Sequence, residues 1–442
     1  MINLFERLNK KNVTLYNSFK YSNLKVPTIV IEETGFLPDD VITPYAFFSE
    51  NVNKSTKPLY FNQLKIPRLW SIEGNNESGL VKDKNKIKAK IFYQKNFKNR
   101  IIERVEWLNG GGHTQYIDYY NKYGIKYAQL ILDSDSQKRI MKFYYNEHGK
   151  KFMTENYITN DVFLTWRNRE FHFSSTINFM NFFIDVSDLK NESFLFNSLL
   201  KSSAIVNNIK TKGENILFWD EDINDNIVSH MHQALRNPYR SLKIIIPNSE
   251  KYEILINKIN HEYKDNVSMG GYVYKFTKEN NYSNQVLNLT NSDQLINIEE
   301  IIQKNKNLDF HIAAVTTMSN KLLNLSHYPN VYLYPNVTKQ KCIELYRSCD
   351  IYLDINRGNE ILDSVRAAYD YNLLILSYDE IKHNIAVTAS ENILPTDESS
   401  VLSEILYKVN RDKQQLNKRL ELQHKKAGSI SKENFRSIFK TK

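Results

Sequence analysis

A short polar stretch near the C-terminal end of the chain holds the side chains best suited to bind a ligand. Arg357, Asn359 and Glu360 follow a largely apolar run at residues 351–355 and precede a second one at residues 373–376. A guanidinium, an amide and a carboxylate can together hydrogen-bond a peptide or an attached sugar. Because these side chains do not include a carboxylate pair, they do not indicate acid–base catalysis. Two interpretations stay open: a peptide- or sugar-binding site, or a surface without a ligand.

The same stretch resembles the sugar-nucleotide half-site of two-domain retaining glycosyltransferases similar to family 4. Those enzymes carry two glutamates eight positions apart, one on the donor sugar and one on the nucleotide ribose. Aligned on the buried strand that follows, the two positions hold Asn359 and Ala367. Glu360 is one position out of register, and its partner would be Ala368. Neither asparagine nor alanine supplies charge-assisted hydrogen bonds, so the resemblance implies a degenerate donor site without catalytic residues.

The positions that would hold a donor diphosphate or a metal ion are also changed. No Lys or Arg occurs between Lys278 and Lys304, where the resemblance implies cations. A Gly-rich phosphate turn is replaced by Thr-Thr-Met-Ser at residues 316–319, and the chain has only 13 glycines in 442 residues. His230 and His232 lie two positions apart in a helical stretch, so they point to different sides and predict no metal site. We therefore expect no cofactor and no metal.

Composition sets the class of the protein. A length of 442 residues predicts two or three domains, and the net charge of +9 fits an acidic partner or an anionic surface. No nucleic-acid recognition motif accompanies this charge, so we expect no nucleic-acid partner. The N-terminal stretch is charged throughout, and no 18-residue apolar run occurs. We expect a cytoplasmic protein, or one peripheral on the cytoplasmic face of the membrane.

The order of predicted elements indicates an α/β fold with two Rossmann-like domains, as in GT-B glycosyltransferases. Residues 1–55 and 166–280 form the first domain, and residues 281–400 form the second. Aromatic-rich strands with no intervening helix indicate an antiparallel β-meander at residues 56–165, inserted into the first domain. Alternation of strands and helices elsewhere predicts parallel sheets. A helical segment at residues 401–442 follows, and the resemblance implies that it crosses back to the first domain.

The meander contains an internal repeat and many aromatic side chains. YYNKYGIK at residues 119–126 and YYNEHGKK at residues 144–151 each predict a strand, an Asn-to-Gly hairpin turn and a strand. Aromatic residues in strands either pack within the sheet or contact a partner. We select five candidates for a partner interface: Trp107, Tyr119, Tyr120, Tyr144 and Tyr145.

Five lysines in the meander alternate with other residues, at positions 82, 84, 86, 88 and 90. On one strand this spacing would place all five ammonium groups on one face. Such a face either protects a solvated sheet edge from aggregation or docks an acidic partner or a membrane.

Over nearly its whole length the chain is similar to the GtfB family, the glycosyltransferase-stabilising proteins of accessory Sec systems in Gram-positive bacteria. The resemblance rests on residues 29–48, 58–74, 105–112, 194–200, 214–221 and 348–376. It implies a non-catalytic subunit that pairs with a catalytic glycosyltransferase, GtfA, in a 2:2 heterotetramer. Such pairs add the first N-acetylglucosamine from UDP-GlcNAc to Ser and Thr of a serine-rich repeat adhesin before its export.

Three classes of function stay open for this sequence. The first is the stabilising and acceptor-binding subunit that the resemblance implies. The second is an active retaining sugar-nucleotide-dependent glycosyltransferase, which would need its acids and phosphate-binding groups elsewhere in the chain. The third is a polysaccharide-binding protein without an enzyme partner. Since the acids, the cations and the glycine turn are absent together, the sequence favours the first.

Overall fold

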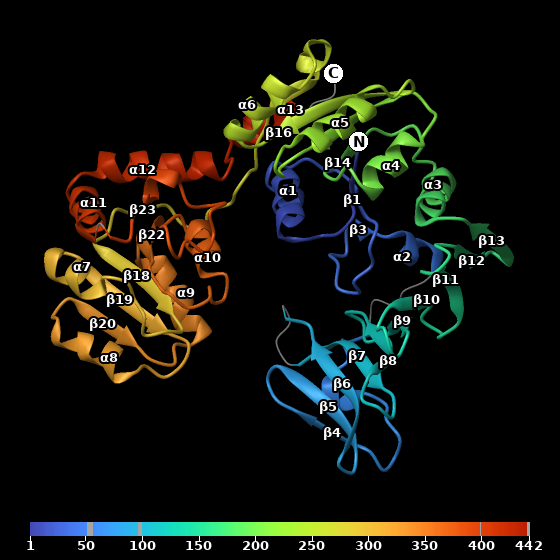
Figure 1. Ribbon diagram of the computed structural model, residues 1–442, viewed down its shortest axis with the longest axis horizontal. Helices are drawn as coiled ribbons and strands as arrows, with labels where there is room; N and C mark the ends of the chain where they lie inside the picture. Colours follow the sequence, from blue (N-terminus) through green and yellow to red (C-terminus); the bar gives the residue numbers. More distant parts are fainter. Residues whose placement is uncertain (51–55, 96–99, 398, 440–442) are drawn as a thin grey trace. The chain divides into compact units, whose positions relative to one another are not determined.

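A computed structural model describes residues 1–50, 56–95, 100–397 and 399–439 (Figure 1). The predicted boundary between residues 55 and 56 adjoins residues outside this description, and so does the end of the predicted segment 401–442.

The described chain forms two compact units. The first contains Met1–Val13, Lys25–Ile245 and Ile254–Ser268, and the second contains Thr14–Leu24, Ile246–Glu253 and Met269–Lys442.

The N-terminal part of the chain builds a seven-stranded sheet with the strand order β17-β16-β15-β14-β1-β2-β3. Its strands are β1 (Ile2–Phe5), β2 (Thr28–Val30), β3 (Val41–Ile42), β14 (Phe194–Phe196), β15 (Gly213–Phe218), β16 (Arg240–Ile246) and β17 (Val267–Met269). The pairs from β3 to β16 are parallel, as predicted. Every residue of β1, β2 and β14 is buried, because parallel sheets are covered on both faces.

Helices connect these strands. They are α1 (Lys10–Tyr21), α2 (Pro44–Phe48), α3 (Thr176–Val186), α4 (Lys201–Asn207), α5 (Asp225–Leu235), α6 (Ser249–Lys258) and the short 3₁₀ helix η2 (His261–Asn266). Several begin at a side-chain cap: Thr43 accepts from the backbone N–H of Ala46, and Ser175 accepts from that of Asn178. These caps satisfy N–H groups that have no partner within the helix.

The predicted meander is a ten-stranded antiparallel sheet whose strands follow one another in sequence order. After the 3₁₀ helix η1 (Phe61–Gln63), its strands are β4 (Ser71–Gly74), β5 (Ser78–Asp83), β6 (Lys86–Tyr93), β7 (Ile102–Leu108), β8 (Thr114–Tyr120), β9 (Lys126–Leu132), β10 (Arg139–Tyr145), β11 (Lys151–Asn156), β12 (Val162–Trp166) and β13 (Arg169–Phe173). Since β13 follows residue 165, the sheet continues past the predicted end of the meander.

The internal repeat forms two hairpin turns with the same hydrogen bonds, as predicted. Asn121 Oδ1 accepts from the backbone N–H groups two and four residues later, at 3.0 Å each. Asn146 Oδ1 does the same at 3.1 and 3.0 Å. Gly124 and Gly149 take positive φ angles of 76° and 72°, which glycine adopts without steric cost.

The five alternating lysines do not share one face, so that prediction is wrong. Lys82 lies in β5, Lys84 lies in the turn with φ of 52°, and the other three lie in β6. A register shift pairs Lys82 with Ile87, which alternates with Lys86 and Lys88 along β6. Asp83, the neighbour of Lys82, pairs with Lys86, so Lys82 and Lys86 face opposite sides of the hairpin.

The C-terminal part of the chain builds a six-stranded sheet with the order β20-β19-β18-β21-β22-β23, in which all pairs are parallel. Its strands are β18 (Gln285–Thr290), β19 (Asp309–Ala314), β20 (Val331–Tyr334), β21 (Ile351–Asp354), β22 (Leu374–Tyr378) and β23 (Ile393–Leu394). This order, with β18 central, is the Rossmann-like arrangement that the sequence predicts.

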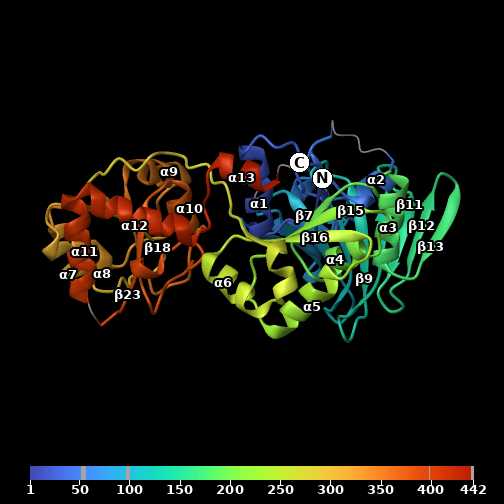
Figure 2. The ribbon, with the colours of Figure 1, turned by 90° about the horizontal axis from the view of Figure 1, so that it is seen from above.

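Helices cover both faces of this sheet (Figure 2). Apolar residues of α7 (Ile298–Lys304), α8 (Asn320–Leu323), α11 (Ser399–Arg411) and α12 (Lys413–Lys426) share one core cluster with the strands. The other cluster includes α9 (Lys339–Ser348) and α10 (Ser364–Asp370). The remaining elements are η3 (Asn324–His327), η4 (Ser390–Asn392) and α13 (Lys432–Phe439). In α13, Phe435 and Phe439 pack on Phe19 with ring centroids 5.1 and 4.9 Å away.

Candidate functional site

The first candidate site is the carboxyl edge of the six-stranded sheet, where β18 and β21 end side by side. Thr290 ends β18, and its hydroxyl donates to Asn356 Oδ1 at 3.0 Å. The amide of Asn356 reaches Asn291 Oδ1 at 3.3 Å, and its Oδ1 also accepts from the backbone N–H of Gly358 at 3.1 Å. A Cβ atom on Gly358 would lie 2.5 Å from Asn291 Oδ1. The two loops at this edge therefore close on each other.

A histidine that the sequence analysis did not select fixes the same loop. His383 Nδ1 lies 2.6 Å from Asp354 Oδ1, and its Nε2 lies 2.7 Å from the carbonyl oxygen of Gly358. Since both ring nitrogens face acceptors, the imidazolium form satisfies both contacts. The hydrogen bond to Asp354 raises the pKa of the His383 imidazole, and burial opposes part of this rise. His383 thus links the end of β21 to the loop that follows β22.

The predicted binding residues at this edge serve local structure. Glu360 accepts from the backbone N–H of Val365 at 3.0 Å and so caps α10. Arg357 forms an exposed ion pair with Glu380 at 3.1 Å. Asn359 is exposed, and the half-buried Ala367 packs against the core cluster of α9 and α10.

The carboxylates around this edge are therefore engaged by the chain itself. Asp354 is 3% exposed and holds His383, whereas Glu360 caps a helix and Glu380 pairs with an arginine. Such engaged groups do not form a pair of acids poised on a sugar donor. Peptide or sugar binding by Arg357, Asn359 and Glu360 stays a prediction.

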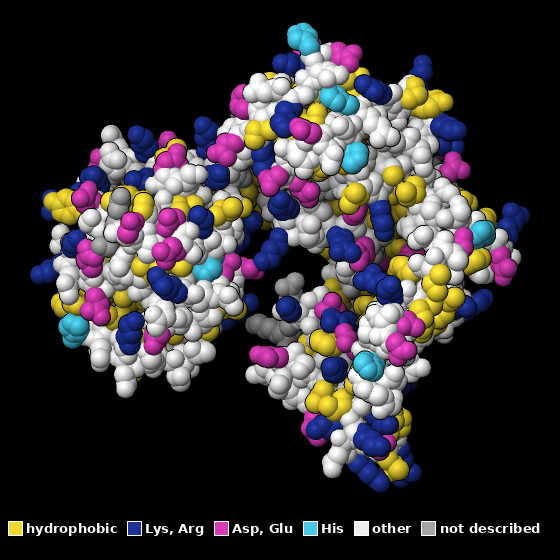
Figure 3. All heavy atoms as spheres, viewed as in Figure 1, with side chains coloured by type: hydrophobic (Ala, Val, Ile, Leu, Met, Phe, Trp, Pro, Cys, Tyr) yellow, Lys and Arg dark blue, Asp and Glu magenta, His cyan; other side chains and the backbone are white. Residues whose placement is uncertain are grey.

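The second candidate site is a face of the ten-stranded sheet that we call the aromatic face. In an antiparallel sheet, directly paired residues point to the same side. One row across β7–β13 contains Val105, Asp118, Gln129, Phe143, Thr154, Phe163 and His172. The adjacent row contains Trp107, Tyr116, Ile131, Met141 and Asn156. Figure 3 shows hydrophobic side chains gathered where Figure 1 places β10 and β11.

Polar contacts run across the aromatic face between neighbouring strands. Trp107 Nε1 donates to Asp118 Oδ2 at 2.9 Å, and Gln129 Nε2 donates to Asp118 Oδ1 at 2.8 Å. Farther along, Phe163 is 47% exposed and stacks on His172 with centroids 5.0 Å apart. This end of the face therefore presents an aromatic surface to solvent, which is typical of an interaction site.

The opposite face of β9–β13 is covered by the helices α2 and α3 of the same unit. Tyr45 of α2 stacks on Tyr144 with centroids 4.4 Å apart and an interplanar angle of 15°. Tyr45, Tyr144 and Tyr157 donate hydrogen bonds to the buried Glu155 at 2.7, 3.2 and 2.9 Å. Burial raises the pKa of Tyr45 and Tyr144, and the Glu155 carboxylate raises it further. Both hydroxyls therefore remain protonated donors.

The five predicted interface residues do not lie on one face. Tyr144 is 2% exposed because Tyr45 of α2 covers it. Its prediction as a partner contact is therefore wrong. Tyr119 and Tyr144 both pair with Ala128, so they point to the same side of the sheet. The ring of Tyr119 contacts the ammonium of Lys142. Trp107, Tyr119, Tyr120 and Tyr145 stay predictions, and the exposed Phe163 was not among the five. The exposure of Phe163 could have been predicted from the alternation in VFLTW at residues 162–166, where Phe163 lies between two buried residues.

Two further features concern residues 1–50, 56–95, 100–397 and 399–439. No helix there combines the length and apolar character needed to cross a bilayer. Among those same residues, no three His, Cys, Asp or Glu side chains are grouped to hold a metal ion.

Two Rossmann-like parallel sheets with an inserted antiparallel sheet define a GT-B glycosyltransferase-like protein. Domain models of one family match most of the chain. They are the GtfB N-terminal domain over residues 2–48, the GtfB middle domain over residues 70–174, the GtfB third domain over residues 176–257, and the GftB/GlyA-F C-terminal domain over residues 286–423. The chain belongs to the GtfB family.

Individual relatives agree with this assignment. The UDP-N-acetylglucosamine–peptide N-acetylglucosaminyltransferase stabilizing protein GtfB of Streptococcus agalactiae is 33% identical over 99% of this chain and 98% of its own. The protein of the same name from Streptococcus parasanguinis is 36% identical over 87% of each chain. A chain in a crystal structure of a GtfA/B complex bound to UDP and GlcNAc superposes with a TM-score of 0.91, 32% identity and 99% coverage of both chains.

Proposed function

We propose that this chain is the non-catalytic stabilising and acceptor-binding subunit of a protein O-GlcNAc transferase complex. Its partner is a catalytic subunit of the GtfA type, in a 2:2 heterotetramer that carries the glycosyltransferase activity. The complex adds the first N-acetylglucosamine from UDP-GlcNAc to Ser and Thr of a serine-rich repeat adhesin. It acts before accessory Sec export, in the cytoplasm or peripherally on the cytoplasmic face of the membrane.

The non-catalytic part of this proposal rests on one observation. The loops at the carboxyl edge of the six-stranded sheet are hydrogen-bonded to each other. Where a retaining transferase needs acids for the sugar and the ribose, this chain has the exposed Asn359 and the core-packed Ala367. The neighbouring loops are tied together through Asn356 and through His383. Removal of a single catalytic group typically lowers rates by about 10²–10³, and here several groups differ together.

The docking part of the proposal rests on the aromatic face. Aromatic residues are enriched at protein interfaces relative to the rest of the surface. Phe163 and the half-buried Phe143 occupy one row of this face, while the opposite face is used for packing within the chain. We place the contact with the catalytic subunit on the aromatic face, with Tyr145 beside Phe143 on β10 and with Trp107 and Tyr120 on β7 and β8.

The test is a transfer assay with labelled UDP-GlcNAc and a Ser/Thr-rich acceptor polypeptide. Three reactions are compared: this chain alone, the catalytic subunit alone, and the two together. The proposal expects no transfer by this chain alone and the highest transfer by the mixture. Transfer by this chain alone would support the alternative, an active retaining sugar-nucleotide-dependent glycosyltransferase. Equal transfer by the catalytic subunit with and without this chain would contradict the stabilising role.

A further inference from the structure

The ten-stranded sheet ends at β13, and no other strand of the described chain pairs with its outer edge (Figure 1). A turn at Arg167 and Asn168 joins β12 to β13. Both residues take positive φ angles, of 50° and 57°, as in the type I′ turns of two-residue hairpins. A free strand edge exposes backbone N–H and C=O groups that can pair with another chain. The proposed function does not use this edge.

The turn determines which backbone groups of β13 point outward. In a two-residue hairpin, the residues that flank the turn form a hydrogen-bonded pair, here Trp166 and Arg169. Hydrogen-bonded and non-hydrogen-bonded pairs then alternate along the strands, so Phe171 bonds to β12, whereas Glu170 and His172 do not. The backbone N–H and C=O groups of Glu170 and His172 therefore point outward, and the residues that the structure describes give them no partner.

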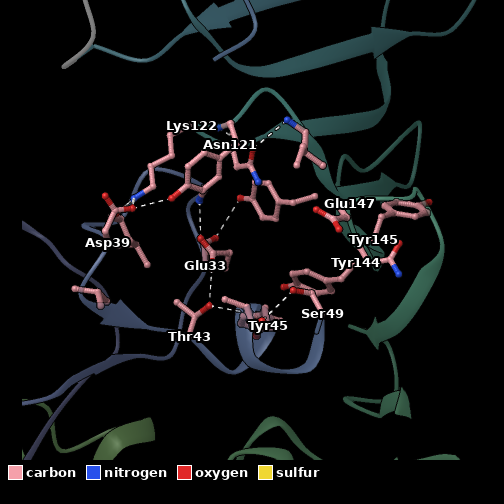
Figure 4. A pocket seen from close by; sticks show the side chains of 18 of the residues that line it. Glu33, Asp39, Thr43, Tyr45, Ser49, Asn121, Lys122, Tyr144, Tyr145 and Glu147 are labelled. Atoms are coloured by element: carbon pink, nitrogen blue, oxygen red, sulfur yellow. Dashed lines mark hydrogen bonds and ion pairs between the residues drawn. The ribbon is translucent and has the colours of Figure 1, made fainter. Parts of the chain in front are cut away.

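The conformation of β13 is fixed from the opposite face of the sheet. Phe171 and Phe173 pack on Phe182 of α3, with ring centroids 4.9 and 5.1 Å away. Farther from the edge, Tyr45 of α2 lies against Tyr144 (Figure 4). The edge is therefore extended before a partner arrives, so pairing has to order few additional residues.

The exposed side chains of β13 include one acid and one histidine. Glu170 and His172 are both exposed, and they lie two residues apart on the aromatic face, at its border with the free edge. His172 Nε2 lies 2.7 Å from Asp161 Oδ1, whereas its Nδ1 has no hydrogen-bond partner within the described ranges. A carboxylate placed opposite His172 can accept a hydrogen bond from this second nitrogen.

The order of residues in β13 is self-complementary. If a second β13 runs antiparallel with the two Phe171 residues opposite each other, Glu170 of each copy faces His172 of the other. This register also makes Glu170 and His172 the hydrogen-bonded pair, which is what their outward backbone groups require. A register with Glu170 opposite itself would bring two carboxylates together, which is unfavourable. Backbone and side chains thus favour the same symmetric register.

We propose that two copies of this chain pair through β13, so that their two ten-stranded sheets join into one continuous sheet. Glu170 of each copy exchanges backbone hydrogen bonds with His172 of the other. Because directly paired residues point to the same side, both aromatic faces lie on one side of the joined sheet, and each can bind a catalytic subunit. This inference rests on the 2:2 composition of the proposed complex and adds the contact between the two copies of this chain.

The first test is sedimentation velocity of the full chain without a catalytic subunit. We expect a reversible equilibrium between monomer and dimer. His172→Pro removes an outward N–H and leaves the bonds to β12 intact, whereas the matched His172→Ala keeps that N–H. We expect His172→Pro to weaken the dimer roughly 100-fold, because two hydrogen bonds are lost per dimer, and His172→Ala to weaken it less than tenfold. A chain that stays monomeric, or equal weakening by the two variants with both folded by circular dichroism, would overturn the proposal.

A cross-linking experiment tests the register. The natural cysteines, Cys342 and Cys349, are both buried. In the proposed register Phe171→Cys lies opposite its own copy, whereas Arg169→Cys lies opposite Phe173 and is too far from its own copy for a disulfide. Under mild oxidation we expect a disulfide-linked dimer of Phe171→Cys and none of Arg169→Cys on non-reducing gels. A linked dimer of Arg169→Cys alone would overturn the register.

The mass of the complex, measured by multi-angle light scattering, separates this inference from the proposed function. With the catalytic subunit bound, we expect the wild-type chain to form a 2:2 complex and His172→Pro to form a 1:1 complex. A His172→Pro chain that no longer binds the catalytic subunit would assign this edge to that subunit and overturn the inference. A failed transfer assay with an intact β13 dimer would contradict only the proposed function.

Discussion

The carboxyl edge of the six-stranded sheet and the aromatic face of the ten-stranded sheet differ in how their polar and aromatic groups are used. At the carboxyl edge, Asp354, Glu360 and Glu380 bond to residues of the chain itself. On the aromatic face, Phe163 stays about half exposed beside His172. The first region uses its polar groups for contacts within the chain, whereas the second leaves an aromatic side chain exposed. The function of a chain depends on its sites and is not determined by its fold.

The largest effect is expected on the covered face of the ten-stranded sheet. Glu155→Ala leaves the hydroxyls of Tyr45 and Tyr144 buried without their acceptor. Burial lowers the pKa of Lys142, and the Glu155 carboxylate opposes this shift. The variant therefore also removes the charge that stabilises the Lys142 ammonium. We expect a loss of about 3 kcal/mol or more in the free energy of unfolding. Chemical denaturation followed by circular dichroism measures it, with the exposed Glu77→Ala as the control. A loss below about 0.5 kcal/mol would show that the network is not integral to the fold.

The next effect concerns the exposed part of the aromatic face. Phe163→Asp places a charge in the proposed interface and should weaken association with the catalytic subunit roughly 30-fold, as expected for an aromatic residue central to binding. Leu69→Asp is the matched control, because Leu69 is 87% exposed on the loop that precedes the sheet. Affinity is measured by surface plasmon resonance. Equal affinities of the two variants would exclude Phe163 from the interface.

A smaller effect concerns the pH dependence of the six-stranded sheet. Because the folded state raises the pKa of His383, its stabilisation is fully present below the ordinary histidine pKa of about 6.5. It is lost as the pH rises through the raised folded-state value. We expect this pH-dependent component to disappear in His383→Gln. His148→Gln is the control, since the His148 side chain is 80% exposed.

Denaturation curves from pH 5 to pH 9 measure this difference. The wild-type chain and the His148→Gln variant should lose stability with rising pH relative to His383→Gln. A parallel pH profile for all three proteins would contradict the imidazolium link between Asp354 and Gly358.

No gain of activity is expected from restoring the two missing acids. Asn359→Glu with Ala367→Glu returns carboxylates to the aligned positions, but residues 279–303 still provide no cation for a diphosphate. The half-buried Ala367 also packs against the core, which disfavours an extended carboxylate there. The transfer assay with the double variant alone should show no product. Measurable transfer would mean that the donor site is more intact than its loop contacts indicate.

The sequence predicted the elements better than the side-chain environments. Period-two alternation predicted the antiparallel strands, and the repeated Asn-to-Gly spacing predicted both turns. Tyr144 looked like a surface aromatic, because the sequence does not show that Tyr45, 99 positions earlier, covers it. The lysine prediction failed at the turn that separates β5 from β6. His383 was missed because its partner Asp354 ends β21 and its partner Gly358 lies in the loop that follows. Only the parallel pairing of β21 with β22 brings these residues close to His383.

The most direct test of the central claim is binding of UDP-GlcNAc to the isolated chain, measured by isothermal titration calorimetry. The catalytic subunit under the same conditions is the positive control. The closed contacts of Asn356 and His383 at the carboxyl edge predict no saturable heat from this chain at concentrations that saturate the control. Tight binding to the isolated chain would contradict the account and would identify this edge as a working donor site.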